Sequence, residues 1–278
     1  MQNKISIIGS SGYLGKNLYN FLSKKKTEHI LGVDSKNGNL LTKKIIKISK
    51  NFNNSKVIYL AAKHRKYGDN LNLKKQNIKM LKNFLLSIKE NKPNFVIFVS
   101  TVEIYGKVKL KVNEKTRCKP LNKYAEGKII QEKLILKFCN KNNIKCMIIR
   151  IPGIYGKNDK NSIIYKIYKT IRDNKTVWHS SGNEKRNYLH VDDFCRIVQI
   201  IFNRKRLPFN IINIISDKSV KLKFIFDMFM NSMKINRKIK FLKHKNEFDL
   251  VFDNKNLKKI VGAFKFKKLE NEIKKYKI

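Results

Sequence analysis

The sequence predicts an α/β fold, a doubly wound parallel sheet (Rossmann-like) with a second, smaller C-terminal domain. In the first half, apolar runs of strand length alternate with longer stretches of helical period. The runs are continuous in Val, Ile, Leu and Phe, as expected for a sheet covered on both faces. The alternation loosens after about residue 155. We therefore expect residues 1–156 to form the first domain, with 186–215 returning to it, and 157–278 to form the second.

Each element is predicted from its own apolar pattern. In the first half, strands are expected at 5–8, 30–33, 57–62, 95–100 and 146–151, with helices starting at 14, running over 78–88 and starting at 124. In the second half we expect a helix over 163–171, a polar loop over 180–185, a helix from 192 and a strand over 209–215.

Composition limits the classes of protein. The chain has 278 residues, 42% of them hydrophobic, which is enough for a real core. The net charge is +43, but the lysines are scattered rather than gathered beside stacking aromatics, so we expect no nucleic-acid partner. No apolar run approaches the length of a membrane span, and the 4 cysteines lack metal-ligand spacing. A cytoplasmic protein without membrane or metal site is expected.

A glycine turn follows the first strand. The segment Gly9-Ser10-Ser11-Gly12-Tyr13-Leu14-Gly15 opens a helix with one apolar face. Gly9 permits a tight turn, Gly12 lets the backbone approach a pyrophosphate, and Gly15 lets the helix sit close to the strand. This strand–turn–helix context predicts a dinucleotide-binding site in residues 1–156.

Asp34 ends the second expected strand, 25 residues after Gly9 by subtraction of their numbers. A carboxylate at this place accepts hydrogen bonds from the adenosine ribose and repels a 2′-phosphate, which favours NAD over NADP. The alternative is an aspartate that starts a turn.

Tyr124 and Lys128 lie four residues apart at the start of an expected helix, so they share a face. The ammonium can lower the pKa of the phenol and allow it to act as a base. The same spacing recurs at Tyr59/Lys63, Tyr105/Lys109 and Tyr165/Lys169. The first two pairs lie on or just after expected strands, where four residues of extended chain separate the two side chains too far to act together. The third pair has no hydroxyl at a strand end before it. Tyr124 differs from the tyrosines of the other pairs because Thr101, at the carboxyl end of the buried run 95–99, can offer a hydroxyl that orients the substrate oxygen and the phenol. A threonine at a strand end without any role is the alternative.

These motifs together resemble the extended short-chain dehydrogenases/reductases, in particular the NAD-dependent epimerase/dehydratase group that acts on nucleotide sugars. Besides the motifs above, the match is carried in family order by Leu60-Ala61-Ala62, Asn77, Ser100-Thr101 with Tyr105-Gly106, Arg150 to Gly156, Arg186 with His190 and Asp193, and Asn213-Ile214. It extends over nearly the whole chain.

The resemblance implies roles for single residues. Tyr124 would exchange a proton with a sugar hydroxyl while hydride moves between that carbon, usually C4, and NAD. Lys128 would hold the nicotinamide ribose, Thr101 would supply a hydrogen bond, and Leu60, Ala61 and Ala62 would lie against the cofactor. Arg186 would bind the diphosphate of a nucleotide-diphosphate sugar, with one more solvated cation as the alternative.

Glu103 bears on the type of reaction. The resemblance places a second acid/base group at this position in several sugar dehydratases and decarboxylases, whereas Val102 stands where some dehydratases have an acid. The alternative for Glu103 is a salt-bridged residue at the rim of the site.

Epimerisation is therefore the function we expect. A 4-keto reductase and a dinucleotide sensor without turnover stay as alternatives, and Thr101, Tyr124 and Lys128 disfavour the sensor. Members of the family often dimerise through a helical bundle, so the resemblance allows a homodimer.

Overall fold

A computed structural model describes residues 3–24, 28–65, 68–109, 111–243 and 247–276 of the chain. The chain divides into two compact units, described separately below. Unit 1 contains residues 1–106, 117–150 and 198–212, and unit 2 contains 107–116, 151–197 and 213–278. The division into domains at residue 156, with a return over 186–215, stays a prediction.

The larger sheet has six strands within the described residues, in the order β2-β1-β3-β4-β5-β9. Its strands are β1 (Asn3–Ile8), β2 (Glu28–Val33), β3 (Lys56–Tyr59), β4 (Phe95–Thr101), β5 (Lys145–Ile151) and β9 (Ile211–Asn213). β1 pairs in parallel with both β2 and β3, and β3 with β4. All seven residues of β4 are buried, as expected for a strand with both faces covered. The predicted α/β class and its parallel sheet are confirmed.

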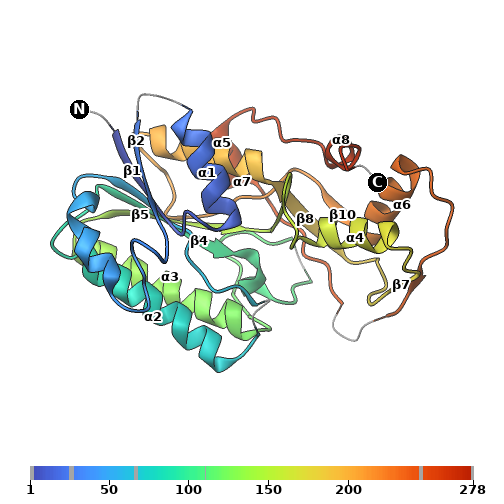
Figure 1. Ribbon diagram of the computed structural model, residues 1–278, viewed down its shortest axis with the longest axis horizontal. Helices are drawn as coiled ribbons and strands as arrows, with labels where there is room; N and C mark the ends of the chain where they lie inside the picture. The colour runs from blue at the N-terminus through green and yellow to red at the C-terminus, as the bar shows by residue number, and fades with distance from the viewer. Residues whose placement is uncertain (1–2, 25–27, 66–67, 110, 244–246, 277–278) are drawn as a thin grey trace. The chain divides into compact units, whose positions relative to one another are not determined.

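Helices cover both faces of this sheet in unit 1. α2 (Leu71–Ser87) and α3 (Lys123–Lys141) lie side by side on one face, and α1 (Tyr13–Ser23) lies on the other (Figure 1). Asn70 and Asn122 cap α2 and α3 by accepting hydrogen bonds from backbone N–H groups three residues on. The caps fix where both helices begin.

Two 3-10 helices in the described part of the chain have no counterpart among the elements predicted from the sequence. η1 (Lys44–Phe52) lies within the Lys- and Asn-rich stretch after β2 and buries the side chains of Ile45 and Phe52. η3 (Val102–Tyr105) starts directly after β4, and the Thr101 hydroxyl caps it by accepting a hydrogen bond from the Glu103 N–H at 3.2 Å. η3 therefore turns the chain sharply at the carboxyl end of β4.

Unit 2 is built on smaller sheets. β6 (Gly153–Tyr155) pairs in parallel with β8 (Lys185–His190), which pairs antiparallel with β10 (Ser219–Lys221), and β7 (Val177–Trp178) pairs with β11 (Lys240–Phe241). α4 (Ile163–Arg172) and α6 (Leu222–Ser232) supply much of its core, and α7 (Lys255–Val261) and α8 (Leu269–Ile273) follow. α5 (Val191–Asn203) has residues in both units. None of the helices in the described part of the chain is long and apolar enough to cross a bilayer.

Candidate active site

The glycine turn forms as the sequence predicts. The N–H groups of Gly9 and Ser10 both donate to the carbonyl of Val33, at 2.7 and 3.0 Å, and Gly9 has φ +96°. A Cβ on Gly9 would lie 2.8 Å from the Ala61 nitrogen, and one on Gly15 would lie 2.1 Å from the Gly9 carbonyl oxygen. Both glycines are therefore required by close backbone approach.

The turn fits the diphosphate of a dinucleotide. A Cβ on Gly12 would meet only the Gly9 oxygen, at 3.3 Å, so an added methyl would stand in the open space before the helix. Gly12 is the N-cap of α1 without a side-chain cap, and the first turn, which begins with Tyr13, Leu14 and Gly15, carries no acid. Backbone N–H groups and the positive end of the helix dipole thus face this space, which favours an anion there.

The neighbouring strands bring further predicted cofactor residues to this edge. The N–H of Leu60, just after β3, donates to the Ile8 carbonyl at 2.9 Å, which holds Leu60, Ala61 and Ala62 beside the glycine turn. Asp34 follows β2, and its Oδ1 accepts from the N–H groups of Lys36 and Asn37, at 2.8 and 3.4 Å. Asp34 therefore starts a turn, and its Oδ2 has no partner within the described residues.

Two contacts anchor α3 to the β4–η3 segment on either side of Tyr124. The Asn122 amide donates to Glu103 Oε2 at 3.0 Å, and Lys128 Nζ donates to the Val99 carbonyl at 2.9 Å. Lys128 Nζ lies 5.8 Å from the centroid of the Tyr124 ring. The structure thus brings Tyr124 and Lys128 to the carboxyl end of β4, where Thr101 is 8% exposed.

The electrostatics of Tyr124 differ from the sequence prediction. Burial, and then the Glu103 carboxylate, raise the pKa of the Tyr124 phenol above its ordinary value, and Arg65 lowers it. Burial also lowers the pKa of Lys128 to about 8, against an opposing effect of Glu132. In the chain by itself the pKa of the phenol is thus raised rather than lowered, because desolvation and Glu103 outweigh Arg65. That Lys128 lowers this pKa stays a prediction.

Glu103 forms an ion pair, as the alternative to a catalytic role predicts. Its Oε2 forms an ion pair with Arg65 Nη1 at 3.2 Å, with the two side chains 32% and 49% exposed. A role for Glu103 in catalysis stays a prediction.

Arg186 lies on β8 in unit 2. Its guanidinium donates to the carbonyls of Lys185, at 2.9 Å, and Phe248, and lies over the Phe248 ring at 4.8 Å from the centroid. Its role toward a diphosphate stays a prediction.

Three residues near Tyr124 were missed by the sequence analysis. Asp69 Oδ1 accepts from the Tyr124 N–H at 3.0 Å, the His64 ring centroid lies 5.7 Å from that of Tyr124, and Arg65 pairs with Glu103. Asp69 precedes the Asn70 cap, a helix-start signal that could have drawn attention to it; His64 and Arg65 carry no such signal.

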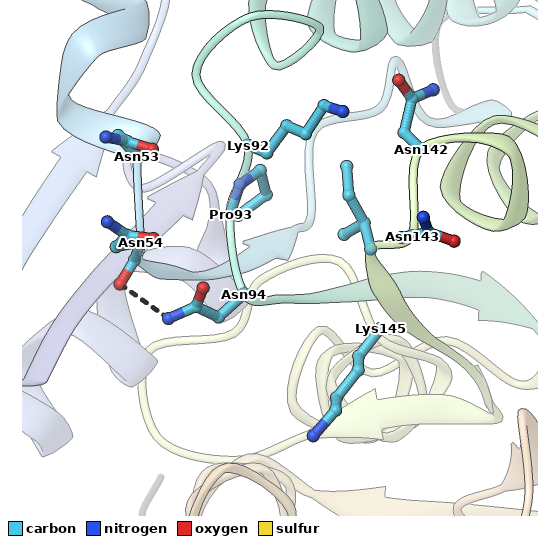
Figure 2. A pocket seen from close by; sticks show the side chains of 9 residues that line it. Asn53, Asn54, Lys92, Pro93, Asn94, Asn142, Asn143 and Lys145 are labelled. Atoms are coloured by element: carbon cyan, nitrogen blue, oxygen red, sulfur yellow. Dashed lines mark hydrogen bonds between the residues drawn. The ribbon is translucent and has the colours of Figure 1, made fainter.

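A polar pocket of about 490 Å³ lies elsewhere in unit 1 (Figure 2). It is lined by the segments that precede β3, β4 and β5, with Lys92 and Lys145 among them. The glycine turn and Thr101 lie at the carboxyl ends of the strands, so this pocket is not the predicted site. Across the described residues, no group of three or more His, Cys, Asp or Glu side chains is placed to hold a metal ion.

Comparison with known proteins connects the site to a family. A dTDP-D-glucose 4,6-dehydratase of Dictyostelium discoideum is 28% identical over 258 residues, which are 77% of this chain and 58% of that protein. An uncharacterised UDP-glucose epimerase of Bacillus subtilis is 23% identical, with 76% of each chain covered. The chain thus spans less than two thirds of the length of the Dictyostelium relative.

Solved structures share the fold. The UDP-glucose 4-epimerase of Thermotoga maritima, solved with UDP-glucose, superposes with a TM-score of 0.85 at 18% identity, covering 98% of this chain and 96% of that one. The UDP-glucuronic acid 4-epimerase of Bacillus cereus, solved with UDP-glucuronic acid and NAD, has a TM-score of 0.81 at 20% identity and covers 97% and 96%.

The family model described as "NAD dependent epimerase/dehydratase family" matches residues 5–214. That range includes the glycine turn, Asp34, Thr101, Tyr124 and Lys128, and it confirms the family resemblance and the expectation of NAD as cofactor. The chain belongs to the NAD-dependent epimerase/dehydratase family.

Proposed function

We propose that the chain is a nucleotide-sugar 4-epimerase that uses Tyr124 as its acid/base residue. The observation that carries the proposal is the attachment of Lys128 to Val99, together with the Asn122–Glu103 contact, because these two hydrogen bonds join the start of α3, which carries Tyr124, to the β4–η3 segment, which carries Thr101. This place lies at the same edge of the sheet as the glycine turn.

Three side chains of the protein have separate roles in the proposed reaction. Thr101 orients the sugar hydroxyl, Tyr124 removes its proton and later returns it, and Lys128 holds the nicotinamide ribose by hydrogen bonding. The bound NAD supplies a hydride acceptor and a positive charge. Because Lys128 Nζ already has a fixed acceptor in Val99, the ammonium is oriented before any ligand arrives.

Epimerisation is favoured over dehydration by the residues after Thr101. Val102 is 5% exposed and offers no proton, and Glu103 is bound by Arg65 and Asn122. Elimination of a hydroxide group needs a general acid, which neither residue supplies in this arrangement. The relatives' names do not make this choice, since the Dictyostelium protein is a dehydratase and the Bacillus subtilis protein is an epimerase; the choice is based on Val102 and Glu103.

A nucleotide-diphosphate sugar is the proposed substrate, with Arg186 as its diphosphate ligand. Arg suits phosphate because its planar fork donates two parallel hydrogen bonds. A homodimer and a cytoplasmic location stay predictions.

The test is incubation of the purified chain and NAD with UDP-, GDP- and dTDP-sugars, with products resolved by NMR. We expect one pair of 4-epimers to interconvert to the same equilibrium from either side, with NAD unchanged in amount. Net consumption of NADH would instead indicate a reductase, and a 4-keto-6-deoxy product a dehydratase. Tight NAD binding without turnover of any sugar would indicate a sensor.

A further inference from the structure

Tyr124 is surrounded by ionisable side chains that reach it from outside its own helix. His64 and Arg65 come from the segment after β3, Asp69 from the segment before α2, and Glu103 from η3. Asp69 is bound to the Tyr124 backbone, and the His64 ring is tilted by 49° against the Tyr124 ring. From its own helix, Tyr124 faces Lys128.

Among these groups, Arg65 and Glu103 form an ion pair with a fixed position. The Glu103 backbone is held by Thr101 through the η3 cap, and its carboxylate accepts from Asn122, two residues before Tyr124. Arg65 Nη1 lies 3.2 Å from the same Oε2 atom that Asn122 contacts. The negative charge of Glu103 therefore stands next to the start of α3, with Arg65 as its counter-ion.

The two members of the pair act on the phenol in opposite directions. A nearby carboxylate disfavours the phenolate, and a nearby guanidinium favours it. Glu103 raises the pKa of Tyr124 and Arg65 lowers it, on top of a larger increase from burial. The fold as a whole determines how deeply the phenol is buried. Of the causes that shift the pKa of Tyr124, only the charges of Glu103 and Arg65 belong to single side chains that a substitution can remove.

We propose that Arg65 is a positioning residue for Tyr124: by pairing with Glu103 it offsets the carboxylate and allows the buried phenol to give up its proton. The consequence for turnover rests on the proposed function, whereas the effect on the phenol itself does not. The role differs from that of a substrate ligand, since Arg65 acts through charge on another side chain.

The test compares Arg65→Gln, Glu103→Gln and the double variant. If Tyr124 acts as the base, kcat/KM rises with pH as the phenol ionises. We expect Arg65→Gln to move this acid-side limb to higher pH and Glu103→Gln to move it to lower pH, each by on the order of half a unit because both side chains are partly exposed. The double variant should lie between the two.

A second readout needs no sugar. The tyrosinate absorbance of each NAD-bound protein, minus that of the same protein carrying Tyr124→Phe, isolates the ionisation of this one phenol. We expect the same order of midpoints, highest for Arg65→Gln and lowest for Glu103→Gln. If no sugar is turned over but this order is found, the proposed function fails and the role of Arg65 stands.

Lys63→Gln is the matched control, because it removes one cation two residues before Arg65 and Lys63 makes no ion pair within the described residues. It should leave both readouts where they are in the parent protein. An Arg65→Gln variant whose midpoint stays unchanged, or falls, would overturn the proposal. So would a uniform loss of kcat without any shift in pH, which is what mere loosening of the segment produces.

Discussion

Lys128 Nζ donates a 2.9 Å hydrogen bond to the carbonyl of Val99, two residues before Thr101 at the end of β4. Lys128 is 3% exposed, and its ammonium also lies 4.8 Å from the centroid of the Phe98 ring. The Lys128–Val99 hydrogen bond attaches the second turn of α3 to β4, the strand that ends with Thr101. A buried cation is held here at a cost in stability, which suggests a purpose other than folding.

Replacing Lys128 by Met should therefore stabilise the chain while abolishing activity. Burial lowers the pKa of Lys128 to about 8 from 10.5, so the unfolded chain binds the proton more tightly, and the penalty is full below pH 8 and fades as pH rises toward 10.5. At pH 7 we expect a gain of roughly 1–3 kcal/mol in the free energy of unfolding after loss of the Val99 hydrogen bond. Urea denaturation measures it. The exposed Lys133→Met on the same helix should change little, and a less stable Lys128→Met would contradict the account.

Gly12→Ala should weaken NAD binding with little loss of stability. Its Cβ would be 3.3 Å from the Gly9 oxygen, a contact that a small shift relieves, but it would occupy the space proposed for the diphosphate. Gly15→Ala, with a contact of 2.1 Å, should instead disrupt the turn and lower Tm as well. Calorimetric titration with NAD and thermal melts separate the two effects. Unchanged NAD affinity in Gly12→Ala would place the diphosphate elsewhere.

Glu132→Gln should destabilise unit 1 strongly. Arg150 donates to both carboxylate oxygens of Glu132, at 3.1 and 2.7 Å, and to the Tyr105 hydroxyl at 2.8 Å, and the two charged side chains are 6% and 7% exposed. Loss of the carboxylate leaves a buried guanidinium without its counter-charge, which costs about 3–5 kcal/mol. Glu126→Gln breaks more exposed pairs on the same helix and should cost less than about 1 kcal/mol. Equal losses in the two variants, measured by denaturation, would argue against this role of burial.

His190 should make unit 2 less stable in mild acid. Burial holds the pKa of this histidine below its ordinary 6.5, with Asp192 opposing and Lys267 reinforcing the effect. The unfolded chain then binds the proton more readily, so stability is complete above pH 6.5 and is lost as pH falls through the lowered value. Tm measured from pH 7.5 to 5 should fall less steeply for His190→Gln than for the parent chain. Parallel curves for the two proteins would remove His190 from the explanation.

Local patterns were sufficient to predict the frame of the site. The glycine turn, the buried run that becomes β4 and the Tyr124/Lys128 spacing each depend on neighbours within one element, and the structure places them at one edge of the sheet. The elevated pKa of Tyr124 could not be predicted, because residue spacing names the neighbours of a phenol but not how much water it loses. The Arg65–Glu103 pair joins a loop to η3 across the fold, and neither residue has a local pattern that reveals the other.

η1 was missed for a related reason. No element is predicted from the sequence over residues 35–54, whereas Ile45 and Phe52 are fully buried in the core of unit 1. Two apolar side chains at wide spacing are a weak signal in sequence, and tertiary packing decides their structure.

The central claim is that the Tyr124 phenol moves the proton at the sugar hydroxyl, and Tyr124→Phe tests it most directly. The change removes one oxygen atom and keeps the ring beside His64, so the fold and the NAD affinity should be unchanged. Turnover of the sugar identified by the product panel should fall by roughly 10²–10⁴-fold. Full turnover in the NAD-bound Tyr124→Phe protein would contradict the account.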